Sequence, residues 1–328
     1  MSFKLCSGLK SIKFLDLPKL RAIEVKDNRH LERVELESSN LYNVVIEQTA
    51  TPCEINLVHC KNIKELNLRA HITDKWLHDH LSELPLIEIL SLVVCSKLER
   101  IKISSHHLKS LELLACANLV EVKIDAPNLC RLWYYYKTII SFSMNGLALS
   151  EAIYHSMSGI VPWNVERIEF LSKLSNSKVL KLMFPSNERG IIPKELRETV
   201  SSPSYNVKHL HLYQPSSALS YTRHEINELM DSLLWISPLL DILTIECSCK
   251  GFPDFYKITF KFSYEKPSYK GDNPSCCKFL PFPCWRHCLK TVKIDNFRGF
   301  ADREILHKYF FENAKSLEDF QFYDGAIA

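Results

Sequence analysis

The sequence predicts an α/β solenoid with a curved parallel sheet on its concave side, and short strands and some helices on its convex side. Three observations predict it. A phrase of spaced leucines repeats, and short apolar segments, which we call pulses, recur roughly every ten or eleven residues. Within each pulse, apolar and polar side chains alternate. The phrase L-x-x-L-x-L-x-x-C-x-x-L is complete at Leu108–Leu119, and Ile87–Leu98 is a variant of it. Self-similarity at a fixed period indicates a stack of like coils.

The pulses predict two strands in each coil. Each pulse follows the pattern L-x-x-I-x-V or a close variant, whose alternate apolar positions bury one face of a short strand. We interpret one pulse as a strand on the concave wall and the next as a strand on the convex side. Phrase and spacing resemble the leucine-rich repeat, whose open wall usually binds other macromolecules. Pulses begin at Leu9, Leu20, Leu31, Leu41, Ile63, Leu98 and Leu119.

Small side chains have expected places within this repeat. Cys60, Cys95 and Cys116 follow apolar pairs, in a slot where cysteine acts as a small buried hydrophobe. Asparagines fall at the bends, where we expect their amides to bond to exposed backbone groups. The asparagines in question are Asn62, Asn118 and Asn128.

One helix interrupts the strands of the first half. Leu77, Leu81 and Leu84 share a helical face, Thr73 is placed to cap the start, and Pro85 stops the helix. The convex piece of that coil is therefore expected to be helical.

The second half carries more helix. The stripe Val165–Leu174 predicts one helix, and Thr222-x-x-Glu225 resembles a capping box before another. We expect loops at 185–206 and 264–284, the second being rich in proline and serine. The closing pattern is strand, helix, strand, which suits the end of a solenoid. The other elements expected are strands at Val179–Phe184, Val207–Tyr213, Leu240–Ile245, Leu289–Ile294 and Leu317–Phe322, and a helix at Asp302–Ala314.

Two segments resemble plant F-box proteins. The resemblance to their leucine-rich region lies in residues 72–132, ITDKWLHDHLSELPLIEILSLVVCSKLERIKISSHHLKSLELLACANLVEVKIDAPNLCRL. The resemblance to the FBD region that ends many of them lies in residues 288–320, CLKTVKIDNFRGFADREILHKYFFENAKSLEDF. The match is weakest over 145–250. The resemblance to plant F-box proteins implies a substrate-recognition role in an SCF-type ubiquitin ligase, in the cytoplasm or nucleus.

The family's F-box is missing from this sequence. An F-box opens with an LP dipeptide and has a tryptophan near its end, whereas Leu17-Pro18 lies in strand-period sequence and the first tryptophan is Trp76. We therefore expect a fragment, a short isoform or a protein that binds targets without delivering them, with a Skp-type adaptor bound only if an F-box is supplied. The expected regions are leucine-rich repeats at 1–145, irregular and more helical repeats at 146–263, and an FBD-like cap at 264–328.

Composition excludes several classes of function. The chain has 328 residues, of which 46% are hydrophobic and 24% charged, with a net charge of +3. This balance gives no reason to expect nucleic-acid or membrane binding. No apolar run is long enough to span a bilayer, and no phosphate-binding glycine loop occurs. The cysteine positions and the lack of an N-glycosylation sequon favour a reducing compartment.

The middle residue of each L-x-L pair is the natural contact row on the concave wall. An aromatic residue such as Trp133 on such a wall is a good anchor for a protein partner. In the run Trp133–Tyr136, alternation exposes Trp133 and Tyr135, and two interpretations stay open: a binding patch, or a packed transition between two styles of repeat. The row that we expect to bind protein is Asn67, Ser91, Glu112, Trp133, Tyr135, Lys181, His211, Thr244 and Lys293.

Catalytic and metal motifs are weak. Cys276, Cys277, Cys284, His287 and Cys288 lie close in sequence, but C-x-x-C pairs are absent and neighbouring cysteines rarely point at one ion, so we assign no metal or cofactor. No H-E-x-x-H or G-x-S-x-G motif occurs, and we expect no enzyme.

The leading function is therefore a protein-binding repeat module whose target the sequence does not name. The alternative is a co-receptor that holds a hormone or an inositol polyphosphate on the concave face. That function needs basic residues that converge, and the available ones are Arg69, Lys181 and Lys293.

Overall fold

The computed structural model describes residues 1–6, 8–48, 51–136, 141–145, 149–156, 162–185, 188–204, 206–214, 221–248, 255–265, 274–296 and 303–323. The chain forms two compact units, Met1–Leu149 and Ser150–Ala328, which are described separately. The stretch 264–328 thus belongs to the second unit. Among the described helices, none is both long and apolar enough to cross a membrane.

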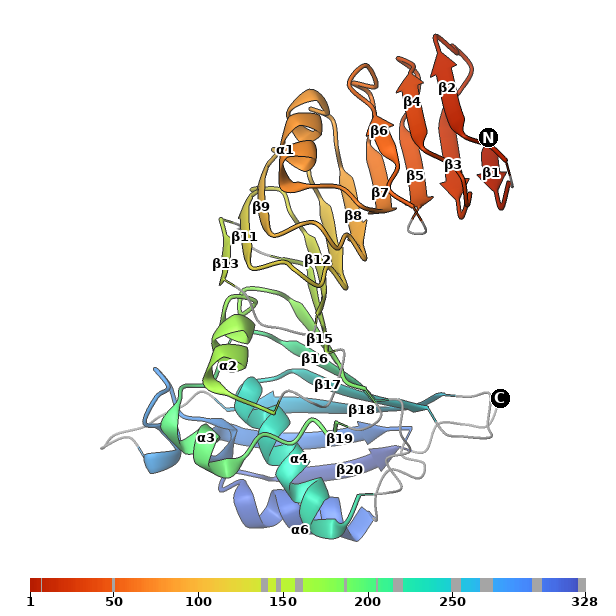
Figure 1. Cartoon of the computed structure of the whole chain (residues 1–328). Helices are drawn as coiled ribbons and strands as arrows, with labels where there is room; N and C mark the ends of the chain where they lie inside the picture. The colour runs from red at the N-terminus through yellow and green to blue at the C-terminus, as the bar shows by residue number, and fades with distance from the viewer. Residues whose placement is uncertain are drawn as a thin grey trace. The chain divides into compact units, whose positions relative to one another are not determined.

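The N-terminal unit contains one long parallel sheet (Figure 1). Neighbouring strands pair in register, so that Asn43 on one strand lies beside Glu65 on the next. The predicted solenoid is confirmed. In order across the sheet, the strands are β1 (Ser2–Lys4), β3 (Ala22–Lys26), β5 (Asn43–Gln48), β7 (Glu65–Ala70), β8 (Ile89–Val93), β10 (Ser110–Leu114) and β12 (Arg131–Tyr136).

The second strand of each coil forms a separate layer, as the pulses predicted. Helix α1 (Asp74–Glu83) replaces that strand in one coil. It starts where the Thr73 hydroxyl accepts a hydrogen bond from the Trp76 amide at 3.2 Å. The second layer consists of two three-stranded parallel sheets, β2 (Ser11–Leu15), β4 (Arg33–Glu37) and β6 (Glu54–Asn56), and β9 (Arg100–Ser104), β11 (Glu121–Asp125) and β13 (Ser141–Met144).

Side chains tie each coil to the coil before it. The thiols of Cys60, Cys95 and Cys116 are fully buried and donate to the carbonyls of Leu36, Leu68 and Leu92. The amides of the bend asparagines donate to backbone carbonyls 22 or 23 residues earlier. Both predictions are confirmed. The hydrogen bonds from these side-chain amides run from Asn62 to the carbonyl of Ser39, from Asn118 to that of Ser96 and from Asn128 to that of His106, at 2.6 to 2.7 Å.

Several strands end in a residue with left-handed backbone conformation. Val94 has a φ of 53°, and its amide donates to the Leu114 carbonyl at 2.7 Å. Asp16 and Asp27 occupy the same position after β2 and β3. This conformation turns the chain out of the strand while keeping one more bond to the next coil.

The C-terminal unit has a mixed sheet, which corrects the expected parallel sheet. The strand β18 (Phe255–Tyr264), which was not predicted, runs antiparallel to both of its neighbours. The other pairs are parallel. The order is β14 (Glu151–Ser156), β15 (Val179–Met183), β16 (His209–Gln214), β17 (Ile242–Ser248), β18 (Phe255–Tyr264), β19 (Leu289–Asp295) and β20 (Asp319–Tyr323).

Helices lie on one face of this sheet (Figure 1). The capping box at Thr222 and Glu225 is present. The two expected loops hold short helices instead, α3 within 185–206 and a 3-10 turn, η2, within 264–284. The helical elements are α2 (Val165–Ser172), α3 (Lys194–Thr199), α4 (Arg223–Ile236), η2 (Ser275–Cys277), α5 (Trp285–Cys288) and α6 (Arg303–Asn313).

A buried ion pair anchors α2. The Arg167 Nη1 atom lies 2.7 Å from Glu188 Oε1, and the Arg167 guanidinium lies 4.0 Å from the centre of the Trp163 ring. The Ser156 hydroxyl donates to the same carboxylate at 3.0 Å. The side chain of Arg167 is only 1% exposed, so this pair is embedded in the core under the sheet.

Candidate functional site

The residues of the expected contact row in the N-terminal unit lie side by side across the sheet. Asn67, Ser91, Glu112 and Trp133 are register partners on the adjacent strands β7, β8, β10 and β12. Their strand neighbours, such as Leu66, are buried, so the row lies on the opposite, outer face of the sheet. Parallel strands in register bring these side chains to about 4.8 Å spacing.

One member of this row does not face solvent as expected. Ser91 is 3% exposed because its hydroxyl donates to Glu112 Oε2 at 2.9 Å and the longer side chain covers it. Asn67, Glu112 and Trp133 are half-buried. The row is therefore a shallow surface, in which the longer side chains supply the exposed area.

The row ends in a surface that we call the aromatic patch, made of Val93, Leu114, Trp133 and Tyr135. Val93, Leu114 and Tyr135 are register partners in the line beside the contact row, and all four side chains are half-buried. Tyr134 points the other way and is 1% exposed, as alternation predicted. Side chain Tyr136 lies outside the described residues. Among those described, the Trp133 indole nitrogen is buried without a hydrogen-bond partner.

The opposite end of the same face is charged instead of apolar. Lys4 and Lys26 both contact Glu24 at 2.8 Å, and Lys26 also contacts Glu47 at 2.7 Å. These two lysines lower the pKa of Glu24 to about 2. The face thus changes from paired charges on β1, β3 and β5 to apolar and aromatic side chains on β8, β10 and β12.

The expected row of the C-terminal unit is only partly in line. Lys181, His211 and Thr244 are register partners across β15, β16 and β17. Lys293 is displaced from this line, because the antiparallel strand β18 pairs Thr244 with Thr259 and Thr259 with Asp295. The antiparallel strand β18, which was not predicted, thus shifts the row by two residues.

Three of these residues already contact neighbouring side chains outside the row. The Lys181 ammonium lies 2.6 Å from Glu151, and His211 Nε2 lies 3.0 Å from Glu246 Oε2. Thr244 was expected to face solvent but is 2% exposed, because His209 reaches across to it at 3.0 Å. Burial is the main cause that lowers the pKa of His211 and of His209.

The two basic residues of the C-terminal unit that were expected to bind a polyphosphate lie far apart. Lys181 on β15 and Lys293 on β19 have three strands between them, which is about 19 Å across a sheet. Arg69 is on β7 of the other unit.

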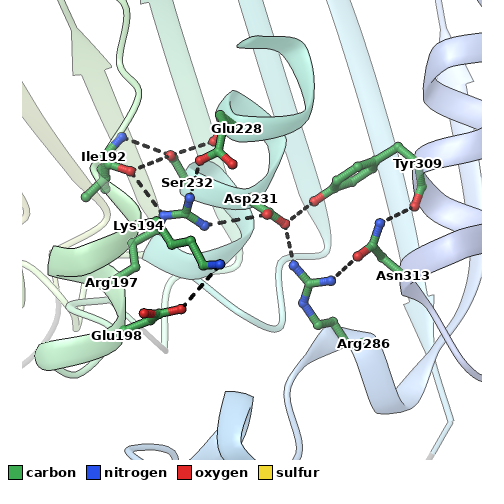
Figure 2. A network of polar contacts seen from close by, with 10 residues as sticks. All are labelled: Ile192, Lys194, Arg197, Glu198, Glu228, Asp231, Ser232, Arg286, Tyr309 and Asn313. Carbon is green, nitrogen blue, oxygen red and sulfur yellow. Dashed lines mark hydrogen bonds and ion pairs between the residues drawn. The ribbon is translucent and has the colours of Figure 1, made fainter. Parts of the chain in front are cut away.

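A polar network joins the helices of the C-terminal unit (Figure 2). Asp231 on α4 is its centre: its Oδ1 atom accepts from Tyr309 at 2.6 Å and from Arg286 at 2.5 Å. Arg197 on α3 lies 3.6 Å from Asp231 Oδ2 and also pairs with Glu228. The network fixes α3, α5 and α6 against α4.

A pocket of about 560 Å³ lies beside this network. Arg197, Asp231 and Arg286 line one part of it, and Phe279 and Leu280 line another. It lies among the helices of the C-terminal unit.

Four potential metal ligands gather at the edge of this pocket. One ligand atom from each of Cys276, Cys277, Cys284 and His287 lies within 4.8 Å of the other three. Cys276 Sγ lies 3.8 Å from Cys277 Sγ, 3.8 Å from Cys284 Sγ and 3.1 Å from His287 Nε2. Burial raises the pKa of the Cys276 and Cys284 thiols, and burial together with Lys315 and Arg286 lowers the pKa of His287. No metal site was predicted here, yet the fold brings these ligand atoms together.

Comparison with known proteins agrees with the repeat architecture. A family model described as "At1g61320/AtMIF1, LRR domain" matches residues 47–322. The chain belongs to this leucine-rich-repeat family. No curated protein and no solved structure matches this leucine-rich-repeat chain.

The family match begins after the first repeats, and the resemblance to F-box and FBD proteins stays a prediction. Leucine-rich-repeat domains are protein-binding modules, so the open sheet faces are where a binding site is expected. The repeat alone predicts the row on β7 to β12. Val93 and Leu114 were not predicted, although the L-x-x-L-x-L-x-x-C phrase places them two residues after the middle of each pair.

Proposed function

We propose that this leucine-rich-repeat chain binds a partner protein across the aromatic patch of its N-terminal unit. The single observation that supports the proposal is the alignment of Tyr135 with Leu114 and Val93 on the outer face of adjacent strands, with Trp133 on the same face of β12. Partly exposed aromatic side chains flanked by aliphatic ones are typical of binding hot spots. Glu112 beside them adds a carboxylate that selects a hydrogen-bond donor or a cation on the partner.

The partner that suits this surface is an extended segment with apolar side chains flanked by a basic residue. The apolar side chains would pack on Trp133 and Tyr135, and the basic residue would meet Glu112. The charged end of the face, with Lys4, Glu24 and Lys26 already paired, offers less apolar area to a partner.

We further propose that this binding serves substrate recognition by an SCF-type ubiquitin ligase in the cytoplasm or nucleus. The support is the resemblance of residues 72–132 and 288–320 to plant F-box proteins. Delivery of the target to the ligase would need an F-box to contact the Skp-type adaptor.

The binding surface is tested by crosslinking and capture with matched variants. Trp133→Ala and Tyr135→Ala should each weaken capture of a specific partner by roughly tenfold or more, as expected for hot-spot residues. Tyr42→Ala is the control, because Tyr42 is an exposed aromatic of the same unit outside the patch. Equal capture by all of these variants, with folding confirmed by circular dichroism, would show that the patch is not the binding surface.

The ligase role is tested separately. An F-box segment is fused upstream of the chain, and the fusion is combined with the adaptor, the cullin and a captured partner. Ubiquitin transfer to that partner should require Trp133 as well as the F-box. Absence of transfer by a wild-type fusion that binds both the adaptor and the partner would end the ligase proposal while leaving the binding surface in place.

A further inference from the structure

The cysteine and histidine cluster of the C-terminal unit comes from two short elements. Cys276 and Cys277 belong to η2, Cys284 is the residue before α5, and His287 lies within α5. A turn separates the pairs and returns the chain on itself. The four ligand atoms therefore meet through local folding of residues 275–287.

The spacing of the sulfur atoms suits one tetrahedral ion. With zinc–sulfur bonds of about 2.3 Å, two sulfur ligands of a tetrahedron lie about 3.8 Å apart. The two distances from Cys276 Sγ to the other cluster sulfurs are both 3.8 Å. The 3.1 Å from Cys276 Sγ to His287 Nε2 is about 0.5 Å shorter than a tetrahedral edge, a difference that a small rotation of the exposed Cys276 removes.

The surroundings also suit metal thiolates. The backbone amide of Cys284 donates to Cys277 Sγ at 3.1 Å, and such a bond stabilises the thiolate form. Cys277 and Cys284 are buried, whereas Cys276 is exposed and leaves a path for an ion to enter. The neighbouring Cys288 is different, because its thiol contacts the carbonyls of Pro283 and Cys284 instead of the cluster.

We propose that Cys276, Cys277, Cys284 and His287 bind one structural Zn²⁺ ion. Three sulfur ligands and one imidazole nitrogen make the closed Cys₃His set of structural zinc sites, whereas Mg²⁺ and Ca²⁺ require oxygen ligands. On binding, the three thiols lose their protons to solvent and the neutral imidazole binds through Nε2.

The ion would fasten η2 and the following turn to α5. That turn carries Phe279 and Leu280, which line the 560 Å³ pocket, and α5 carries Arg286, which joins the network around Asp231. The site therefore stabilises the wall of a pocket whose other side is already fixed by the network shown in Figure 2.

The test uses the full chain, purified with a reductant that does not chelate metal. Mass spectrometry of the elements should find roughly one zinc per chain. Exchange for Co²⁺ should produce the sulfur-to-cobalt charge-transfer absorption and the intense visible bands of a tetrahedral site. Removal of zinc with a chelator should lower the melting temperature of the wild type.

The variants are chosen at the exposed side of the site, where folding is least affected. Cys276→Ser and His287→Ala should each weaken metal affinity by roughly tenfold or more. Cys130→Ser removes another exposed cysteine and Cys288→Ser removes a buried one beside the site, and both should keep the full zinc content. Circular dichroism checks that each variant folds.

Three results would overturn the proposal. The first is reduced wild-type protein that takes up neither zinc nor cobalt. The second is equal zinc affinity of Cys276→Ser and Cys130→Ser in competition with a chelator, which would assign the metal to other cysteines among the 12 in the chain. The third is a cobalt spectrum without sulfur ligation.

Discussion

Single residues at the strand ends show how the coil turns. Val94 adopts a left-handed backbone conformation, which glycine, asparagine and aspartate tolerate but a β-branched residue does not. Asp16 and Asp27 satisfy this preference at equivalent positions. The backbone at Val94 is strained, since the hydrogen bond from its amide to the Leu114 carbonyl requires that conformation.

The first prediction relieves this strain. Val94→Asn should raise the free energy of unfolding by about 1 kcal/mol, because asparagine adopts the left-handed region at lower cost and the side chain is 37% exposed. Urea unfolding measures the change. Val93→Asn is the control one residue earlier, within β8, and it should destabilise. A loss of stability at Val94→Asn would contradict the assigned cause.

At the scale of the element, the buried pair Arg167–Glu188 fixes α2. Removal of either side chain leaves the other as an unpaired buried charge, which lowers the free energy of unfolding strongly. Replacement of both side chains by apolar ones is often tolerated. Helix α2 therefore depends on an interaction that hydrophobic periodicity does not reveal.

The second prediction concerns this pair. Arg167→Ala and Glu188→Ala should each lower the free energy of unfolding by about 3–5 kcal/mol. The double variant Arg167→Met with Glu188→Leu should lose far less than the sum of the two. Denaturant unfolding of the full cycle measures this. Single losses below about 1 kcal/mol, the size of a surface pair, would show that the pair is not buried in solution.

The third prediction concerns pH and the strand β16. Burial lowers the pKa of His209 and His211; Lys257 and Lys181 act in the same direction on His209, while Glu246 opposes the shift at His211. In the unfolded chain both histidines have a pKa of about 6.5, so below that pH the unfolded state takes up protons that the folded state refuses. Stability is therefore fully present above about pH 6.5 and falls as the pH drops.

The measurement is the urea midpoint at about pH 7.5 and about pH 5.5, either side of the ordinary histidine pKa. His209→Gln should reduce the difference between the two midpoints. His224→Gln, at an exposed histidine on α4, should leave it as in the wild type. If the His209→Gln and wild-type midpoints shift equally, another group is responsible.

What the sequence could predict at this scale follows from periodicity. The strands, α1 and the capping box at Thr222 were predictable because their apolar spacing and caps are local. The strand β18 was not predicted although Phe255–Tyr264 alternates, and its antiparallel direction could not be, because alternation carries no information on strand direction. The convergence of Cys276 and His287 was also hidden, since it depends on the turn that returns α5 to η2.

The candidate surface divides in the same way. Repeat spacing alone places Asn67, Glu112 and Trp133 on one face, because coils stack in register. The burial of Ser91 and Thr244 follows from which neighbouring side chain folds over them, and the displacement of Lys293 follows from β18. Neither can be read from spacing.

For the whole molecule, the important property is that each coil contacts mainly its neighbours. In such a chain, the free energy of unfolding is close to a sum of the stabilities of single coils and of the contacts between neighbouring coils. A destabilising substitution therefore affects mainly its own coil and the coils stacked beside it. The division into Met1–Leu149 and Ser150–Ala328 sets a natural limit to that spread.

The fourth prediction tests this locality. Leu113→Asp should lower stability by more than about 3 kcal/mol, because it places a charge between Leu92 and Tyr134 in the core. Hydrogen exchange should then show lost protection in β8, β10 and β12, with β15, β16 and β17 still protected. Glu112→Ala, one residue away, should cost about 1 kcal/mol or less, the value of its bond to Ser91. Equal effects of the two changes would show that the strand faces are assigned wrongly.

The asparagine amides at the bends have a consequence for how such a chain changes length. Each of Asn62, Asn118 and Asn128 bonds to a main-chain carbonyl, which every amino acid supplies, and that carbonyl lies one coil back. The asparagine of a coil therefore forms this hydrogen bond whatever side chains the preceding coil carries. In-frame duplication or loss of one coil preserves the same contact between coils, so repeats can be gained or lost in evolution without further substitutions at the contacts between coils.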